Sequence, residues 1–336
     1  MRLPRPPSSP PSPEVAGHCV IGIDLGGTKI LAGAVDPELG VTHRVRRAAP
    51  TRDADTLLDA VVAVVEEVRA AAGGEVLGAG FGIPCLIDSE TELVASSVHL
   101  PLAGVPFAAV MAERLGLPAF VENDANLALL AEHAHGAARG AANALMLTLG
   151  TGIGGGVIID HRLYRGSRGA AGELGHMVVW PDGPDCGPGC PSRGCLEAVA
   201  SGSALVREAR RAAAEDPGCG LGRALASGRE IDGPLVSELA AGGDPTAAGL
   251  LAEVGRWLGL GLVSLVNIFN PDVIVVGGGV IAAGEMLLGP ARAVVAERAL
   301  RLPGGHVRIA AAHFGPESGM LGGAVLAYDA IDRRAA

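Results

Sequence analysis

From Cys19 to Val35 the chain reads CVIGIDLGGTKILAGAV, and this stretch decides the fold. An apolar run leads into a turn made of Gly26, Gly27 and Thr28, and a second apolar run follows it. Two short apolar runs on either side of a glycine-rich turn predict a β-hairpin. We therefore expect a sheet that begins with two antiparallel strands.

The same plan returns in the middle of the chain. From Leu145 to Asp160 the sequence reads LMLTLGTGIGGGVIID, and Leu149, Gly150 and Asp160 keep the spacing of Leu25, Gly26 and Asp36. Two α/β halves that open alike predict a duplicated fold of two lobes. We expect a nucleotide cleft between the lobes, because ligand sites favour domain interfaces.

Helices and strands alternate after each hairpin, as hydrophobic periodicity and turn residues indicate. We expect a disordered Pro- and Ser-rich tail at 1–17, a small α/β domain at 18–140 completed by the last helix at 318–330, and a large α/β domain at 141–317. The expected helices span residues 55–72, 106–115, 125–135, 203–214, 247–269, 285–300 and 318–330, and the expected strands span 76–83, 119–121, 272–276 and 307–311.

Composition argues against several classes of partner. The formal net charge is −10 and no block of basic residues occurs, whereas nucleic-acid binding needs a clustered basic face. The most apolar run, Trp257 to Val266, is too short to span a bilayer, and residues 1–17 lack the apolar core of a secretory signal. We expect a cytoplasmic homodimer or homotetramer that binds small molecules, without nucleic-acid or membrane partners.

The first glycine turn has the chemistry of a phosphate site. Several glycines let successive backbone N–H groups converge on an anion, because no Cβ blocks the approach. Asp24 is expected to hold Mg²⁺, while Gly26, Gly27, Thr28 and Lys29 are expected to reach nucleotide phosphates. Lys29 is the only lysine of the chain, and the other basic residues are arginines. An ordinary hairpin turn is the alternative.

The second turn formally matches a dinucleotide fingerprint, Gly150-x-Gly152-x-x-Gly155. That fingerprint needs a helix after its glycines, whereas the β-branched run that begins at Val157 predicts a strand. We therefore expect a second phosphate turn that uses Thr148, Gly150, Thr151 and Gly152. A third cluster, Gly277-Gly278-Gly279, follows an apolar strand and is expected to let adenosine approach the backbone, although a plain strand end is equally consistent with it.

A candidate general base lies where an apolar strand meets a helix. Glu122, Asn123 and Asp124 separate the strand from the helical run that starts at Ala125. Asp and Asn are preferred helix caps, so Asp124 could simply cap this helix. A carboxylate at the rim of a cleft is also where a base must stand to accept a hydroxyl proton during phosphoryl transfer.

A compact set of metal ligands follows the second hairpin. His176 belongs to Glu173-Leu174-Gly175-His176, and Cys186, Cys190 and Cys195 follow in a loop of Gly and Pro. One histidine and three cysteines form a tetrahedral zinc set with no open position. We expect a structural Zn²⁺ that holds the loop, in a reducing compartment.

Together these segments resemble the ROK family of repressors and kinases, over roughly Val20 to Tyr328. The resemblance rests on the following motifs: Asp24-Leu25-Gly26-Gly27-Thr28-Lys29, Gly82-Ile83-Pro84, Glu122-Asn123-Asp124-Ala125-Asn126, Gly150-Thr151-Gly152-Ile153-Gly154-Gly155-Gly156, Glu173-Leu174-Gly175-His176, Gly194-Cys195-Leu196-Glu197 and Val276-Gly277-Gly278-Gly279. It implies a duplicated actin-like ATPase (ribonuclease H-like) fold that closes on a sugar and ATP.

The resemblance also implies roles for single residues. Asp124 would be the catalytic base, and a sugar would contact Gly82, Asn123, Asp124, Glu173, His176 and Glu197. His176 would then serve both zinc and sugar. The segment Ala200-Ser201-Gly202-Ser203-Ala204-Leu205 is most similar to glucokinases, which phosphorylate the 6-hydroxyl of glucose.

The sequence departs from the family pattern at three places. Pro191 replaces a glycine of the cysteine loop, and Cys186 stands two residues further from Cys190 than is usual, which puts zinc ligation by Cys186 in question. Cys85 follows Pro84 where glycine is usual, and His99 stands where Asn is frequent; both positions bear on sugar preference.

Three alternatives stay open at this point. The first is a kinase for another sugar, namely fructose, mannose, N-acetylglucosamine or N-acetylmannosamine, because hydroxyl-binding residues are shared among such activities. The second is polyphosphate as donor. The third is a sugar-sensing repressor, which would need a recognition helix, whereas only a proline-rich segment precedes Val20.

Overall fold

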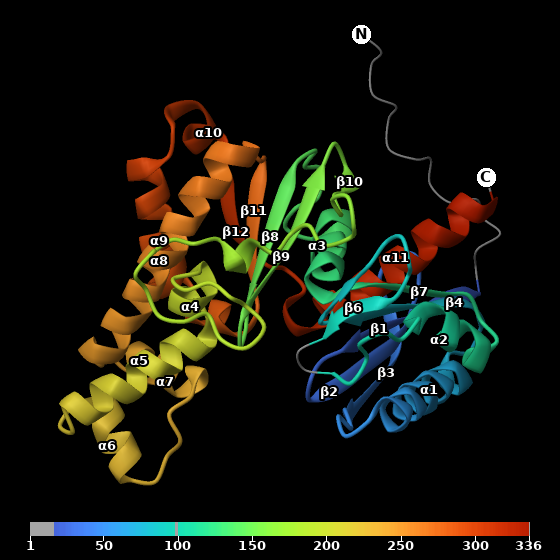
Figure 1. Ribbon diagram of the computed structural model, residues 1–336, viewed down its shortest axis with the longest axis horizontal. Coiled ribbons are helices and arrows are strands. Elements are labelled where there is room, and N and C mark those ends of the chain that lie inside the picture. Colours follow the sequence, from blue (N-terminus) through green and yellow to red (C-terminus); the bar gives the residue numbers. More distant parts are fainter. Residues whose placement is uncertain (1–16, 98–99, 336) are drawn as a thin grey trace.

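The computed structural model describes residues 17–97 and 100–335, and it forms two lobes that meet at the centre of the molecule (Figure 1). A five-stranded sheet forms the frame of each lobe. The first sheet has the order β3 (Val41–Ala48), β2 (Lys29–Val35), β1 (His18–Leu25), β4 (Glu75–Ile83) and β7 (Ala119–Asn123). The second has the order β10 (Arg162–Leu163), β9 (Ile153–Ile159), β8 (Ala144–Leu149), β11 (Val273–Gly277) and β12 (Arg308–Ala311).

The two sheets share one topology. In the first, β2 is antiparallel to both β1 and β3, while β1, β4 and β7 are parallel neighbours. In the second, β9 is antiparallel to both β8 and β10, while β8, β11 and β12 are parallel neighbours. The predicted hairpins at 19–35 and 145–160 are confirmed, and with them the duplicated α/β plan.

Helices cover both faces of each sheet. In the first half α1 (Ala54–Ala71) leads into β4, and the small hairpin of β5 (Cys85–Ile87) and β6 (Val94–Ser97) connects β4 to α2 (Phe107–Leu115). Helix α3 (Asp124–His135) follows β7. The other helices are α4 (Leu196–Ala200), α5 (Gly202–Glu215), α6 (Gly220–Ala226), α7 (Gly233–Ala241), α8 (Pro245–Phe269), α9 (Glu285–Arg298), α10 (Arg301–His306) and α11 (Ser318–Ala335), with short 3-10 turns η2 (Leu174–His176), η3 (Gly279–Ala283) and η4 (Gly315–Glu317).

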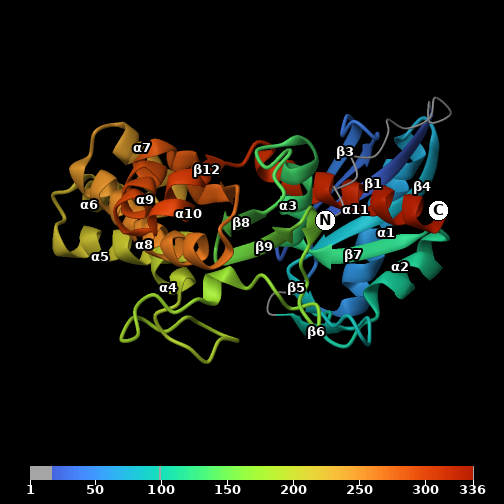
Figure 2. The ribbon, with the colours of Figure 1, turned by 90° about the horizontal axis from the view of Figure 1, so that it is seen from above.

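The halves exchange one helix each. Successive side chains of β1 point to opposite faces, so Ile21 and Ile23 pack towards α1, while Val20 packs with Met320 of α11. Helix α3, although it follows the first sheet, packs Leu129 against β8, β9 and β11 of the second. Figure 2 shows α3 between the two lobes and α11 beside it over the first sheet, in agreement with their extensive contacts. The boundary at 140/141 stays a prediction.

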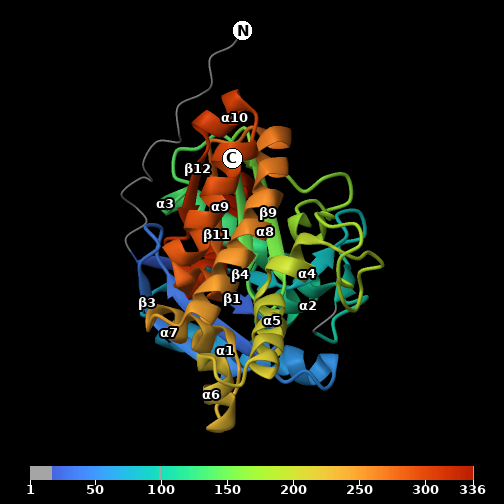
Figure 3. The ribbon, with the colours of Figure 1, turned by 90° about the vertical axis from the view of Figure 1, so that its left-hand side faces the viewer.

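Helix α8 is the longest of the described helices, with 25 residues. Among the described helices it is the one long and apolar enough to cross a membrane, but half of its apolar window is buried inside the protein. It runs beside α9 and contacts α7 (Figure 3). Its apolar character therefore serves the core, as predicted for residues 247–269.

Several elements were not expected from the sequence. Strand β3 reads VTHRVRRA at an exposed edge, where basic residues are common because they deter pairing with other chains. Helix α10 contains Pro303, Gly304 and Gly305, which are poor helix formers, and Leu300 caps it instead of ending α9. Except for Gly17, the predicted tail at 1–17 lies outside the described residues, as does His99.

Close backbone packing joins α3 to α11. A Cβ atom on Gly322 would overlap the carbonyl oxygen of Leu127. Gly322→Ala should therefore force the helices apart and lower the stability by ~1–3 kcal/mol, as overpacking does. Gly249→Ala in α8 is the matched control, since no atom lies within 4 Å of a Cβ there. Urea unfolding measures both; equal midpoints would contradict this packing constraint.

Candidate active site

Two glycine turns lie at the ends of the central strands β1 and β8. Gly26 N donates to Lys29 O at 2.9 Å, and Gly150 N donates to Gly152 O at 2.9 Å. The turns differ by one residue, because Leu25 pairs with Ile30 while Leu149 pairs with Ile153. The second turn leads directly into β9, which confirms that its glycines open a strand and not a dinucleotide-binding helix.

Asp24 and Lys29 face each other across the first turn. Lys29 Nζ lies 3.9 Å from Asp24 Oδ2, and 16% of the Asp24 side chain is exposed. Burial raises the pKa of Asp24 to about 6, the nearby Asp124 carboxylate also raises it, and Lys29 lowers it. Asp24 and Asp124 therefore share one charged region, which a divalent cation would stabilise.

The capping role at the start of α3 belongs to Asn123. Its Oδ1 accepts from Ala125 N at 2.9 Å and from Asn126 N at 3.2 Å, whereas Asp124 is the first helical residue. Asp124 Oδ1 itself accepts from Ala125 N at 2.9 Å. The helix N-terminus favours an ionised carboxylate at this position. Gly82 lies close by in β4, where a Cβ would be 3.7 Å from Asp124 Cα.

The junction before Asp124 is anchored by Glu122, to which the sequence assigned no role. Glu122 is 6% exposed. Its Oε1 accepts from Asn123 N at 2.9 Å and Asn126 Nδ2 at 3.0 Å, and its Oε2 accepts from Arg165 Nε at 2.6 Å. Arg165 lies after β10, so this ion pair ties the end of β7 to the loop that leads to Glu173. No sequence signal marked Arg165.

Further polar groups reach this region from the second lobe. His176 Nε2 lies 3.6 Å from a Glu173 carboxylate oxygen. Partial burial raises the pKa of Glu173, His176 lowers it, and the Asp124 and Glu197 carboxylates raise it. The predicted residues Asp124, Glu173, His176 and Glu197 are thus brought together from three different elements.

Glu197 explains one glycine of the second turn. Its Oε2 accepts from Ile153 N at 2.6 Å, and a Cβ on Gly152 would overlap that same oxygen. Gly152 therefore makes room for Glu197, and the phosphate contact expected for it stays a prediction. Because Glu197 is the second residue of α4, this bond also fixes α4 against the turn.

The four predicted zinc ligands lie together. Their ligand atoms are all within 4.8 Å of one another. Cys186 Sγ lies 3.4 Å from His176 Nδ1, and Cys190 Sγ lies 3.9 Å from Cys195 Sγ. A tetrahedral ion with Zn–S bonds of about 2.3 Å places sulfur atoms about 3.8 Å apart. The donor set fits zinc. Cys186 lies within this group of ligands although its spacing from Cys190 is longer than usual.

The loop that carries these cysteines packs on the core through tryptophan. The rings of Trp180 and Trp257 stack with centroids 5.3 Å apart and an interplanar angle of 7°. Trp257 lies in α8, so the loop is attached both to α8 and to the Cys/His cluster. Cys85, in contrast, is buried in β5, and its Sγ lies 3.1 Å from Ser97 Oγ, which links β5 to β6.

A pocket of about 650 Å³ opens beside the second turn. Three predicted nucleotide residues line it, namely Gly150, Thr151 and Gly279. Gly277 is instead buried in β11, and Gly278 has φ +85° and touches the Leu149 backbone. The sequence did not predict the rest of the wall, which comes from α5, from η3 and from α7, a helix that was not expected. Its residues are Gly202, Ser203, Leu205, Val206, Arg207, Arg210, Gly233, Pro234, Ser237 and Val280.

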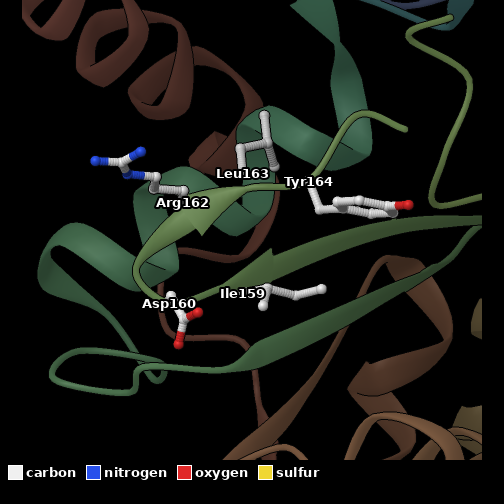
Figure 4. Close-up of a pocket in the computed structure, with 5 residues that line it drawn as sticks. All are labelled: Ile159, Asp160, Arg162, Leu163 and Tyr164. Carbon is white, nitrogen blue, oxygen red and sulfur yellow. The ribbon is translucent and has the colours of Figure 1, made fainter. Parts of the chain in front are cut away.

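A second hollow lies on the β9–β10 hairpin and holds none of the predicted residues (Figure 4). Its lining consists of Ile159, Asp160, Arg162, Leu163 and Tyr164. The pocket between the second turn, α5 and α7 is therefore the better candidate for a ligand site, because it contains predicted residues.

Comparisons with known proteins agree with this geometry. The glucokinase of Streptomyces coelicolor is 38% identical over 92% of this chain and 97% of its own length, and that of Thermotoga maritima is 35% identical over 93% and 98%. A crystal structure of a ROK family glucokinase from Streptomyces griseus in complex with glucose and AMPPNP superposes with a TM-score of 0.81, at 38% identity over 93% of this chain and 99% of that one.

These similarities confirm the predicted actin-like ATPase fold. They extend over almost all of the described residues, and residues 20–330 match the family as a whole. The chain therefore belongs to the ROK family.

Proposed function

We propose that this chain transfers the γ-phosphoryl group of ATP to the 6-hydroxyl of glucose, giving glucose 6-phosphate and ADP. The observation that carries the proposal is the meeting of Asp124 from the first half with Glu173, His176 and Glu197 from the second, next to the pocket at Gly150 and Thr151. The glucokinase relatives, and the Streptomyces griseus structure with glucose and AMPPNP, support the choice of glucose and ATP.

Asp124 is the general base in this proposal. It stands at the start of α3, where it can accept the proton of the 6-hydroxyl while that oxygen attacks the γ-phosphorus. Asn123 uses its Oδ1 as a helix cap, so its Nδ2 group is the part left to donate to a sugar oxygen. Glu173, His176 and Glu197 orient the other hydroxyls, and Gly82 leaves space beside Asp124.

The nucleotide occupies the second lobe. Adenosine fits the pocket lined by α5, α7 and Gly279, with Gly277 and Gly278 shaping the end of β11. The glycines of the two turns, Gly26, Gly27, Gly150 and Gly152, then let the backbone approach the phosphates, because no Cβ blocks it. The N–H groups of Gly26 and Gly150 donate inside their own turns, and the Thr28, Thr148 and Thr151 hydroxyls and Lys29 complete the contacts. Asp24 would hold Mg²⁺, which neutralises charge on the transferred phosphoryl group when it is bound.

Zinc has a structural part in the proposal. His176 Nδ1 lies on the cysteine side while Nε2 lies near Glu173, so one ring can serve the ion and the sugar at once. His176, Cys186, Cys190 and Cys195 would hold Zn²⁺ and thereby fix the orientation of the His176 ring. Cytoplasmic location and a homodimeric or homotetrameric state complete the proposal.

Removal of the base is the first test. Asp124→Asn should lower kcat with glucose and Mg²⁺·ATP by about 10²–10⁴, because the amide cannot accept the hydroxyl proton. Coupled ADP-release kinetics measure the effect. Asp160→Asn, at the exposed end of β9, is the control and should keep kcat. If Asp124→Asn kept wild-type activity within a few-fold, Asp124 would not be the base.

Zinc binding is tested at the ligand with unusual spacing. Cys186→Ser should lower the zinc content per chain and raise the KM for glucose, because the His176 ring loses its anchor. Elemental analysis and kinetics provide the two readouts. Cys219→Ser is the control, since Cys219 Sγ caps α6 by accepting from Gly222 N. Wild-type protein without zinc after a chelator wash would refute the site.

Lys29 should determine the pH at which kcat/KM for ATP falls on the acid side of the pH profile. Lys29 lowers the pKa of Asp24, so its removal raises that pKa above about 6. Because Mg²⁺ needs ionised Asp24, the fall of kcat/KM for ATP at low pH should move to higher pH in Lys29→Met. Lys29→Arg keeps the charge and should leave the pH of this fall unchanged. If kcat/KM for ATP falls at the same pH in Lys29→Met as in the wild type, Lys29 does not control the ionisation of Asp24.

A further inference from the structure

Glu132 is a charged residue for which the proposed chemistry has no use. It lies one turn before the end of α3 and is 0% exposed. Its Oε2 accepts from Ala137 N at 2.7 Å, and its Oε1 accepts from His313 N at 2.8 Å and Phe314 N at 3.0 Å. Three backbone donors thus converge on one buried carboxylate, which compensates the cost of burying its charge.

Two of the three donors lie where the chain returns from the second half to the first. His313 and Phe314 belong to the segment between β12 of the second sheet and α11, which covers the first sheet. The outward crossing is at the junction of β7 and α3, where Asp124 lies. Helix α3 therefore touches one crossing with its first residue and the other through Glu132. Asp124 and Glu132 are eight residues apart, which separates the two points by roughly 12 Å along the helix axis.

We propose that Glu132 is a positioning residue that fixes the axis about which the two lobes close. Two attachment points on one rigid helix define an axis of rotation, whereas one point would also allow the lobes to swivel. Gly322 packs directly on the Leu127 backbone and keeps α11 beside this axis. The inference rests on the proposed function, because the axis matters by holding Asp124 in line with the phosphoryl donor.

The two carboxylate oxygens of Glu132 make the proposal testable. Glutamine has one acceptor oxygen, so Glu132→Gln can serve Ala137 or the 313–314 segment, but not both; Glu132→Ala serves neither. We expect kcat with glucose to fall by about tenfold in Glu132→Gln and up to about a hundredfold in Glu132→Ala, the loss expected from a misplacement of ~1 Å. The acid limb of the pH profile should stay in place, because Asp24 and Asp124 remain.

Lobe closure gives a second readout that does not depend on turnover. Solution scattering should show a decrease in radius of gyration when wild-type protein binds glucose and AMPPNP, and a smaller decrease in both Glu132 variants. Tyr328→Phe is the matched control. It removes one partly buried hydrogen bond, from Tyr328 Oη to Val35 O at 2.9 Å, and Tyr328 lies in α11, away from both crossings. It should keep both kcat and closure within twofold.

The outcomes separate the two hypotheses. Glu132→Gln with kcat and closure equal to those of Tyr328→Phe would overturn the positioning role, as would equal losses in all three variants. If Glu132→Ala fails to fold, Glu132→Gln carries the test alone. A wild-type protein that closes on its ligands without phosphorylating glucose would refute the proposed function, while the comparison of closure would still decide the role of Glu132.

Discussion

The structure depends on how each sheet buries its second face. Helices α1 and α2 cover one face of the first sheet, and the cluster around α8 covers one face of the second. The remaining faces are covered by exchange, because α11 returns to the first sheet and α3 packs on the second. This exchange places two helices between the lobes, and the first residue of α3 is Asp124. Burial of apolar surface thereby determines where the proposed base stands.

Charge is the second constraint on the site. Four carboxylates meet in one region with Lys29 and His176, namely Asp24, Asp124, Glu173 and Glu197. Burial raises the pKa values of Asp24 and Glu173, and repulsion from the neighbouring carboxylates raises them further. Such a group of carboxylates is unfavourable without a partner. Mg²⁺ and the hydroxyl groups of a sugar are the partners that would relieve the repulsion and the lost hydration.

Local patterns predicted the hairpins, most of the helices and the grouping of His176 with the three cysteines, because these depend on spacing within short segments. Longer-range features escaped prediction. Arg165 reaches Glu122 only after the lobes have come together, and Glu132 reads as an ordinary helical residue until His313 and Phe314 are folded onto it. The small size of Gly152 makes room for Glu197, which is distant in sequence, and no local pattern indicated this contact. Helix α7 was missed, and with it one wall of the pocket.

The central claim is that the residues around Asp124 bind glucose for phosphorylation by ATP. Its most direct test is ADP release from Mg²⁺·ATP with glucose, mannose, fructose, N-acetylglucosamine and N-acetylmannosamine under identical conditions. We expect turnover with a clear preference for glucose. Preference for another of these sugars would contradict the proposed substrate. If no sugar is turned over, either with ATP or with polyphosphate as donor, the kinase assignment itself would be contradicted.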